Sequence, residues 1–103
     1  MDIVKKNNIE LCNIRIECNK NSEMDVRSLL CKNVEANKLT LESLEKIDIT
    51  DDEVRLRANV ITNEISKVES VINILSSNIN IKNISWAHFN YKDVDTEDED
   101  DRD

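Results

Sequence analysis

Val54-Arg55-Leu56-Arg57-Ala58-Asn59-Val60 is the most regular segment of the chain, because apolar and polar side chains alternate along it without exception. Successive side chains of a β-strand point to opposite faces of the sheet, so this alternation predicts a half-buried strand. Just before it, Thr50-Asp51-Asp52 has the composition of a turn, since Asp and Thr side chains bond their own backbone. We therefore expect residues 54–60 to be the second strand of a hairpin.

The first strand of that hairpin is predicted from the apolar residues between positions 39 and 49. These residues are Leu39, Leu41, Leu44, Ile47 and Ile49. Their alternation slips by one position between Leu41 and Leu44. We expect a β-bulge at that point, because a bulge lets both halves of the strand face the core.

Two further segments have the alternation of strands. In the first, apolar residues from Cys12 to Cys18 alternate with polar ones. In the second, over residues 84–91, Ile84, Trp86 and His88 share one face, and Ser85, Ala87, Phe89 and Tyr91 share the other. We expect Trp86 to be a large core side chain that points towards the helices, and His88 to lie at a rim.

Two segments have helical spacing instead. The first covers about residues 22–37 and starts at Ser22, with Glu23 and Asp25 in the first turn, where negative charge suits the helix dipole. The second follows Thr62 or Asn63, either of which we expect to cap it. Its apolar stripe consists of Ile65, Val68, Val71, Ile72, Leu75 and Ile79.

The resulting order is strand, helix, strand, strand, helix, strand. Two helices between four strands with one apolar face each are accommodated most simply on one side of a sheet. The sequence thus predicts an α+β, ferredoxin-like βαββαβ sandwich, with a four-stranded antiparallel sheet and two helices on one face. The other face would carry Arg15, Glu17, Arg55, Arg57 and Phe89. Because the chain has no Gly and no Pro, we expect Asn and Asp to take any positive φ.

Length and charge limit the organisation and the partners. The 103 residues allow one core, so we expect one domain at 9–91, a linker or disordered segment at 1–8, and an acidic disordered tail at 92–103. The net charge is −8, and residues 93–103 contribute −7 of it, which leaves −1 for the other 92 residues. No basic stripe remains to attract nucleic acid. No apolar run has the length of a spanning helix or signal peptide, so we expect a soluble, intracellular chain.

The three cysteines, Cys12, Cys18 and Cys31, form no CxxC pair. On one strand, Cys12 and Cys18 would lie about 20 Å apart, which is beyond disulfide reach. The spacing C-x5-C-x12-C with one distant His also lacks the short-spaced pair typical of zinc sites. We predict three buried, reduced, structural cysteines.

Residues that carry chemistry are sparse. Without glycine, a phosphate-binding glycine loop is impossible. His88 is the only histidine, and Ser85 lies on the opposite face of its strand, so the two form no nucleophile pair. Asp51-Asp52-Glu53 lacks the ligand spacing of a calcium loop. We therefore expect no enzymatic activity, no cofactor and no tight metal site.

Several phrases of the sequence belong together as a family pattern. They are Leu39-Thr40-Leu41-Glu42-Ser43-Leu44, Val54-Arg55-Leu56-Arg57-Ala58, Ile72-x-x-Leu75-Ser76 and Ile81-x-x-Ile84-Ser85-Trp86. With these phrases the chain resembles, over about residues 9–91, the C-terminal cytoplasmic domain of the MgtC/SapB membrane proteins. Ile84, Ser85 and Trp86 form the most distinctive signature. The chain departs from the pattern at Asn78-Ile79-Asn80, where the family often has Pro or Gly.

The resemblance implies a fold and a setting. Proteins of this bacterial family have a membrane-embedded half followed by a soluble domain similar to ACT domains, which are small-molecule-sensing ferredoxin-like sandwiches. They are associated with magnesium homeostasis or transport and with virulence. By this resemblance the chain would be a cytoplasmic domain, attached to the cell membrane and to its membrane-embedded half in the full-length protein.

Two hypotheses of different classes follow. The first is a non-enzymatic regulatory or assembly domain that forms a homodimer through a strand edge or through the open sheet face. The interface residues would then be Arg15, Arg55, Arg57, Phe89 and Tyr91. The alternative is a ligand-sensing ACT-type domain that binds an amino acid or a divalent cation at a dimer interface. ACT ligand sites usually have a Gly-bearing first turn, and Asn19-Lys20-Asn21 has no Gly, which favours the first hypothesis.

Overall fold

The computed structural model describes residues 9–90, and within them the elements follow the predicted order. The strands are β1 (Glu10–Asn19), β2 (Thr40–Asp48), β3 (Glu53–Thr62) and β4 (Ile81–Asn90), and the helices are α2 (Glu23–Ala36) and α3 (Ile65–Ser76), with a short 3-10 helix η1 (Lys20–Ser22) before α2. The predicted segments 1–8 and 92–103, and Tyr91, lie outside the described residues.

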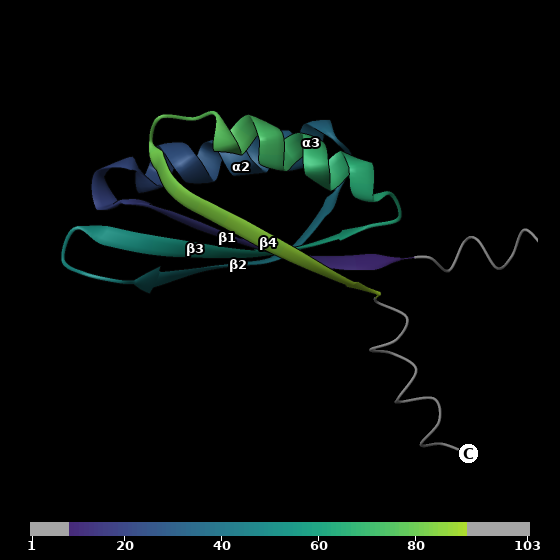
Figure 1. Cartoon of the computed structure of the whole chain (residues 1–103), viewed down its shortest axis with the longest axis horizontal. Helices are drawn as coiled ribbons and strands as arrows, with labels where there is room; N and C mark the ends of the chain where they lie inside the picture. Colours follow the sequence, from purple (N-terminus) through teal and green to yellow (C-terminus); the bar gives the residue numbers. More distant parts are fainter. Residues whose placement is uncertain (1–8, 91–103) are drawn as a thin grey trace, which may run out of the picture.

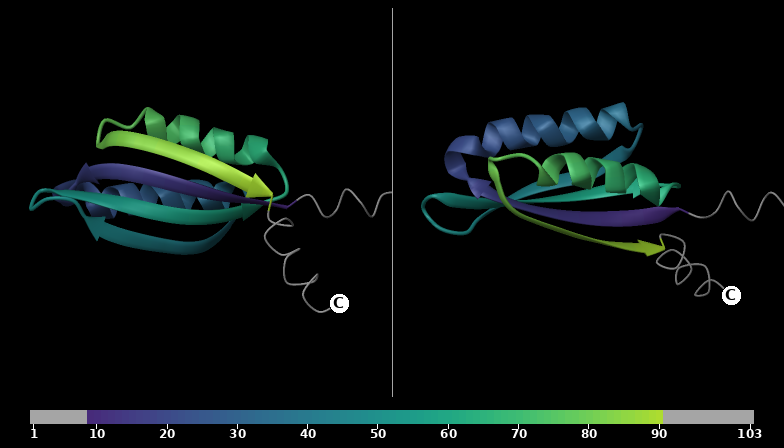
Figure 2. Two further views of the ribbon diagram at one scale, coloured as in Figure 1. Left: turned by 60° about the horizontal axis from the view of Figure 1, so that its bottom comes forward. Right: turned by 45° about the horizontal axis from the view of Figure 1, so that its top comes forward.

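The strands form one antiparallel sheet with the order β2-β3-β1-β4. Both helices cover the same face of this sheet, and the other face is open (Figure 1). Figure 2 shows the open face in its left view, with β4 and β2 at the two edges. The predicted ferredoxin-like βαββαβ sandwich is confirmed.

The core lies between the sheet and the two helices. Its buried apolar side chains are Cys12, Ile14, Ile16, Cys18, Val26, Leu30, Val34, Val54, Leu56, Ala58, Val60, Val68, Val71, Ile72 and Leu75. The strand members come from β1 and β3, because these inner strands are flanked on both sides. Trp86 packs against this core and stays half-buried, since β4 is an edge strand.

The predicted bulge in β2 is present, but its effect on the end of the strand differs from the expectation. The register with β3 shifts between Leu41 and Ser43, and Leu41 and Leu44 both pack against the core. Beyond the bulge, however, Ile47 lies opposite Arg55, on the open face. Ile49 is 39% exposed. The expectation that both point to the core was wrong. The bulge places Leu44 on the core face, and from there side chains alternate again, so Ile47 and Ile49, at odd positions, fall on the opposite face from Leu44.

Three local predictions about the connections were also wrong. The residue with positive φ is Lys38 (φ 58°), not an Asn or Asp. The N-cap of α3 is Glu64, because Thr62 ends β3 with its hydroxyl bonded to the Glu64 backbone at 2.9 and 3.0 Å. Ile79 is 95% exposed, since α3 ends at Ser76, before the apolar stripe reaches this residue.

Neither α2 nor α3 has the length and apolar character that a membrane-crossing helix needs, and this holds for residues 9–90.

Candidate interaction surface on the open sheet face

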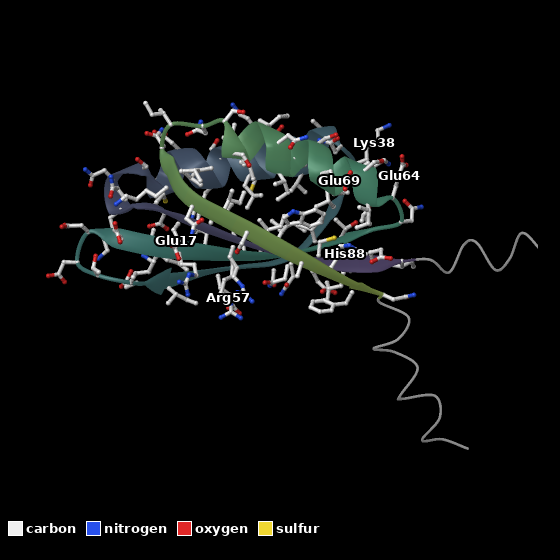
Figure 3. All side chains as sticks on the ribbon, viewed as in Figure 1. Glu17, Lys38, Arg57, Glu64, Glu69 and His88 are labelled. Carbon is white, nitrogen blue, oxygen red and sulfur yellow. The ribbon has the colours of Figure 1, made fainter. Side chains whose placement is uncertain are left out.

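The open face gathers four of the five predicted interface residues. Arg15, Arg55, Arg57 and Phe89 alternate with core residues on their strands and point away from the helices. Figure 3 shows Arg57 on that side of the sheet. Tyr91, the fifth, lies outside the described residues. In the signature, Ser85 joins the open face, whereas Ile84 and Trp86 pack against the core.

One end of the open face is apolar. Leu11 lies between Ile61 of β3 and Phe89 of β4 in the strand register. Phe89 is 54% exposed, and Leu11 and Ile61 are half-buried. This end presents one aromatic and two aliphatic side chains side by side, next to the last described residues of β4.

A row of amides lies next to this apolar end. Asn13 donates from Nδ2 to Asn59 Oδ1 at 2.8 Å, and Asn59 donates from Nδ2 to Ser43 Oγ at 2.9 Å. Arg15 donates from Nε to Asn13 Oδ1 at 3.2 Å. These bonds link β2, β3 and β1 across the open face, so the side chains of the row hold one another in place.

The three arginines of the open face differ in their partners. Arg55 pairs with Glu17, with 2.7 Å between Nη2 and Oε2. Arg15 and Arg57 lie directly opposite each other on β1 and β3. Within residues 9–90, neither of these two forms an ion pair. They form a cationic pair, which we call the Arg15/Arg57 pair.

A shallow hollow of about 180 Å³ lies beside Arg15, lined by Asn13, Arg15, Ser85, Trp86 and Ala87. A second hollow, of about 290 Å³, lies at the end of the sheet and is lined by Ile9, Lys38, Thr40, Ile61, Thr62 and Asn63. The first combines a guanidinium, an amide and a hydroxyl, which are groups that bind anions or carbonyl oxygens.

On the helix-facing side of β4, His88 contacts Glu10, with 2.9 Å between Nδ1 and Oε1. Its ring centroid lies 5.6 Å from that of Trp86. Sequence reasoning missed the pairing with Glu10, because 78 positions separate the two residues and only the strand register brings them together. His88 is exposed, and its contacts tie the end of β4 to β1.

The cysteines divide into two buried thiols and one exposed thiol. All three are free. Burial, together with the negative charge of Glu10, raises the pKa of the Cys12 thiol to about 11. Burial and the charge of Glu23 raise the pKa of Cys18 as well. Cys31 is exposed on α2, so the prediction that all three are buried was wrong for this residue.

The acidic turn between β2 and β3 is organised by its own side chains. Thr50 Oγ1 accepts hydrogen bonds from the backbone N–H groups of Asp52 and Glu53, each at 3.1 Å. Glu53 also pairs with Lys82 of β4. In the part of the chain that the structure describes, no three His, Cys, Asp or Glu side chains gather in a way that could hold a metal ion.

The two edge strands differ in their protection. β2 carries a bulge and four charged residues, Glu42, Glu45, Lys46 and Asp48. β4 also has a register shift, but it lies at the start of the strand, where Asn83 pairs with Glu17 and Ile81 pairs with Cys18. The charged or titratable residues of β4 are Lys82 and His88, and they pair with Glu53 and Glu10. Charges hinder further strand pairing, and β4 has fewer of them and an unbroken register over residues 83–90, so β4 is the less protected edge.

One family model and several solved structures are similar to this chain. The family model described as "MGTC/SAPB C-terminal domain" matches residues 13–86. No curated protein matches the chain by sequence. Among solved structures, the C-terminal domain of the MgtC protein from Mycobacterium tuberculosis is similar with a TM-score of 0.71 and 20% identity, over 81% of this chain and 90% of that chain. The ACT domain from GTP pyrophosphokinase of Chlorobium tepidum is similar with a TM-score of 0.59 and 12% identity, over 75% and 96%.

Proposed function

Because the chain belongs to the MgtC/SapB C-terminal domain family, we propose that it is a non-enzymatic regulatory or assembly domain of an MgtC-like membrane protein. In this proposal the domain is cytoplasmic and joined to a membrane-embedded half, and the full-length protein serves magnesium homeostasis or transport and virulence. The family match over residues 13–86 is the observation that carries the proposal.

The domain works by homodimerisation through the edge of β4. This edge is ten residues long, and its two charged or titratable side chains are engaged within the domain. In the dimer, the β4 strands of two copies pair antiparallel. The two four-stranded sheets then form one continuous sheet of twice the width. The open face is the less favourable interface, because the Arg15/Arg57 pair would be brought against a second copy without an ion-pair partner.

Mass measurement in solution at several protein concentrations tests this interface. We expect wild-type protein to approach twice the 11.9 kDa chain mass as its concentration rises. Ala87→Lys places a charge on the exposed β4 edge and should give a monomer. Thr40→Lys is the matched control, because it adds the same charge at an exposed position of β2 and should leave the dimer intact.

Two results would contradict the β4 interface. A wild-type chain that stays monomeric at every concentration removes the dimer altogether. A dimer that survives Ala87→Lys but is lost in Arg57→Glu moves the interface to the open face. Retention of the dimer in Arg57→Glu removes the support for the open-face version.

A second candidate function is that of a ligand sensor for an amino acid or a divalent cation at a dimer interface, which the ACT-like fold favours. The connection between β1 and α2 does not favour a ligand sensor, because ACT ligand sites usually have Gly in this turn. Here residues 20–22 form a 3-10 helix without Gly, and Lys20 N donates a 2.8 Å hydrogen bond to Asp52 O. Thermal melts with amino acids and magnesium separate the two functions. A ligand at 100 times its Kd adds about 2.7 kcal/mol to the free energy of unfolding, so a sensor gives a clear shift.

A further inference from the structure

We propose that the Arg15/Arg57 pair and Ser85 form a binding site for a carboxylate on the open sheet face. The three residues lie in one row across the sheet, because Arg57 and Ser85 are the register partners of Arg15 on β3 and β4. This places two guanidinium groups and a hydroxyl on three adjacent strands. The site is independent of the dimer proposed above, which uses the β4 edge.

The first argument is electrostatic. Like charges directly opposite each other in an antiparallel sheet are destabilising. Arg55, in the next row, is neutralised by Glu17, whereas the Arg15/Arg57 pair has no ion pair with any residue between 9 and 90. Glu45 is the register partner of Arg57 on β2, yet its carboxylate lies beyond the 4.0 Å of an ion pair. A bound anion removes the repulsion between the two arginines.

The second argument is preorganisation. The Arg15 Nε–H bond to Asn13 fixes the guanidinium, and Asn13 is fixed in turn by Asn59 and Ser43. A guanidinium has five N–H donors, so four donors of Arg15 have no acceptor within the described residues. A planar group that is already oriented loses little conformational entropy when it binds a carboxylate with two parallel hydrogen bonds.

The third argument is space. The hollow of about 180 Å³ adjoins Arg15 and Ser85, and the small side chain of Ala87 lines it. Drug-sized ligands occupy pockets of about 300–1,000 Å³, so this hollow fits one small acid group. Glu45 lies beside Arg57 on β2, and its charge repels a carboxylate group, with one charge, less than a phosphate group, which carries about two.

A carboxylate can come from two sources, a free organic acid or the chain's own acidic residues 93–103. Asn90 is the register partner of Glu10, so the end of β4 lies about 17 Å along the sheet from Arg15. Seven further residues span up to about 23 Å when extended, so Glu97 and the acids after it are within reach.

NMR titration of the full chain with succinate tests the site, with sodium chloride at equal ionic strength as the reference. We expect saturable shifts of the Arg15 and Arg57 Nε–H signals and of the Ser85 and Ala87 backbone amides. The double variant R15Q/R57Q should weaken succinate binding by on the order of tenfold, because charged hydrogen bonds are lost. Arg27→Gln is the matched control, since it removes an arginine charge on α2, and it should bind succinate as wild type does.

A variant that ends at residue 92 identifies the source of the carboxylate. Succinate binding that becomes several-fold tighter shows that residues 93–103 occupy the site in the full chain, and unchanged binding shows a site for a free acid. Both results support the site. It is overturned if the shifts equal those in sodium chloride, or if R15Q/R57Q keeps wild-type affinity while its melting temperature shows that it is folded. Ser85→Ala gives a second test, with a smaller loss of affinity expected.

Discussion

Cys12 shows how the position of a single side chain changes its chemistry. The residue is fully buried in β1, where a thiolate has no water and faces the charge of Glu10. Its pKa is therefore about 11 in the folded protein, against 9.0 for an ordinary thiol. A group with a raised pKa in the folded state contributes its full stability below pH 9, and this contribution is lost as the pH rises through 11.

Alkaline unfolding should therefore depend on Cys12. Between pH 8 and pH 11 we expect the wild type to lose about 2 kcal/mol more of its free energy of unfolding than Cys12→Ala does, as urea titrations would measure. Cys31→Ser is the control, because its thiol is exposed, and it should follow the wild type. Equal losses in Cys12→Ala and the wild type would contradict the role of this thiol.

At the scale of elements, the connection from α2 to β2 holds a specific strain. Lys38 has a φ of 58°, a region that costs a residue with a Cβ about 1–2 kcal/mol. The conformation persists because the turn satisfies the end of α2, with bonds from Lys38 N to Glu35 O at 3.0 Å and from Leu39 N to Val34 O at 2.9 Å. A glycine takes this conformation without the steric cost.

Lys38→Gly should therefore raise the free energy of unfolding by about 1 kcal/mol. Lys32→Gly, the same substitution at an exposed position inside α2, should lower it by about 1 kcal/mol. Urea unfolding of the two variants beside the wild type checks both signs. If Lys38→Gly destabilises the domain as Lys32→Gly does, the left-handed turn is not a source of strain.

The elements themselves were predictable where one local pattern decides them. Alternation located β1, β3 and β4, and the slip between Leu41 and Leu44 located the bulge of β2. Prediction failed where two neighbouring patterns meet. Thr62 has the composition of a helix cap, but the apolar pattern of β3 continues to it and buries it at the end of the strand. Likewise, nothing in the local sequence favours Lys38 over Asn37 for a positive φ.

At the scale of the whole molecule, stability should decrease from the inner strands to the edges. β1 and β3 supply the fully buried strand residues, whereas β2 and β4 have one unpaired edge each within the described residues. Amides exchange slowly when only global unfolding exposes them. We expect the slowest hydrogen exchange at residues 12–18 and 54–60, and faster exchange along β4.

Hydrogen exchange also tests the proposed dimer, because pairing of two β4 edges would protect backbone amides that are open to solvent in a monomer. Exchange along β4 should slow as the protein concentration rises, while exchange along β2 should not change. A concentration effect on β2 alone would contradict the choice of edge. Exchange that is equally slow in all four strands at low concentration would contradict the gradient itself.

The candidate site was predictable only in part. The alternation of β1 and β3 placed Arg15, Arg55 and Arg57 on one face, and this holds in the structure. Which arginine finds an acid depends on register: Glu17 is opposite Arg55, whereas Arg15 is opposite Arg57. Local sequence carries no information on the register between strands that lie 40 positions apart. For the same reason, the hydrogen bonds that join Asn13, Asn59 and Ser43 and the pairing of His88 with Glu10 could not be predicted.

The pairing of Glu10 with Asn90 sets how the domain bears mechanical load. The first and last strands are antiparallel neighbours, so the two ends of the described chain leave the sheet side by side (Figure 1). A force that pulls these two ends apart breaks the backbone hydrogen bonds between β1 and β4 one after another. It does not stretch all of these hydrogen bonds at the same time. Tension between the two ends of the domain would thus separate β4 from the sheet first and expose the backbone edge of β1.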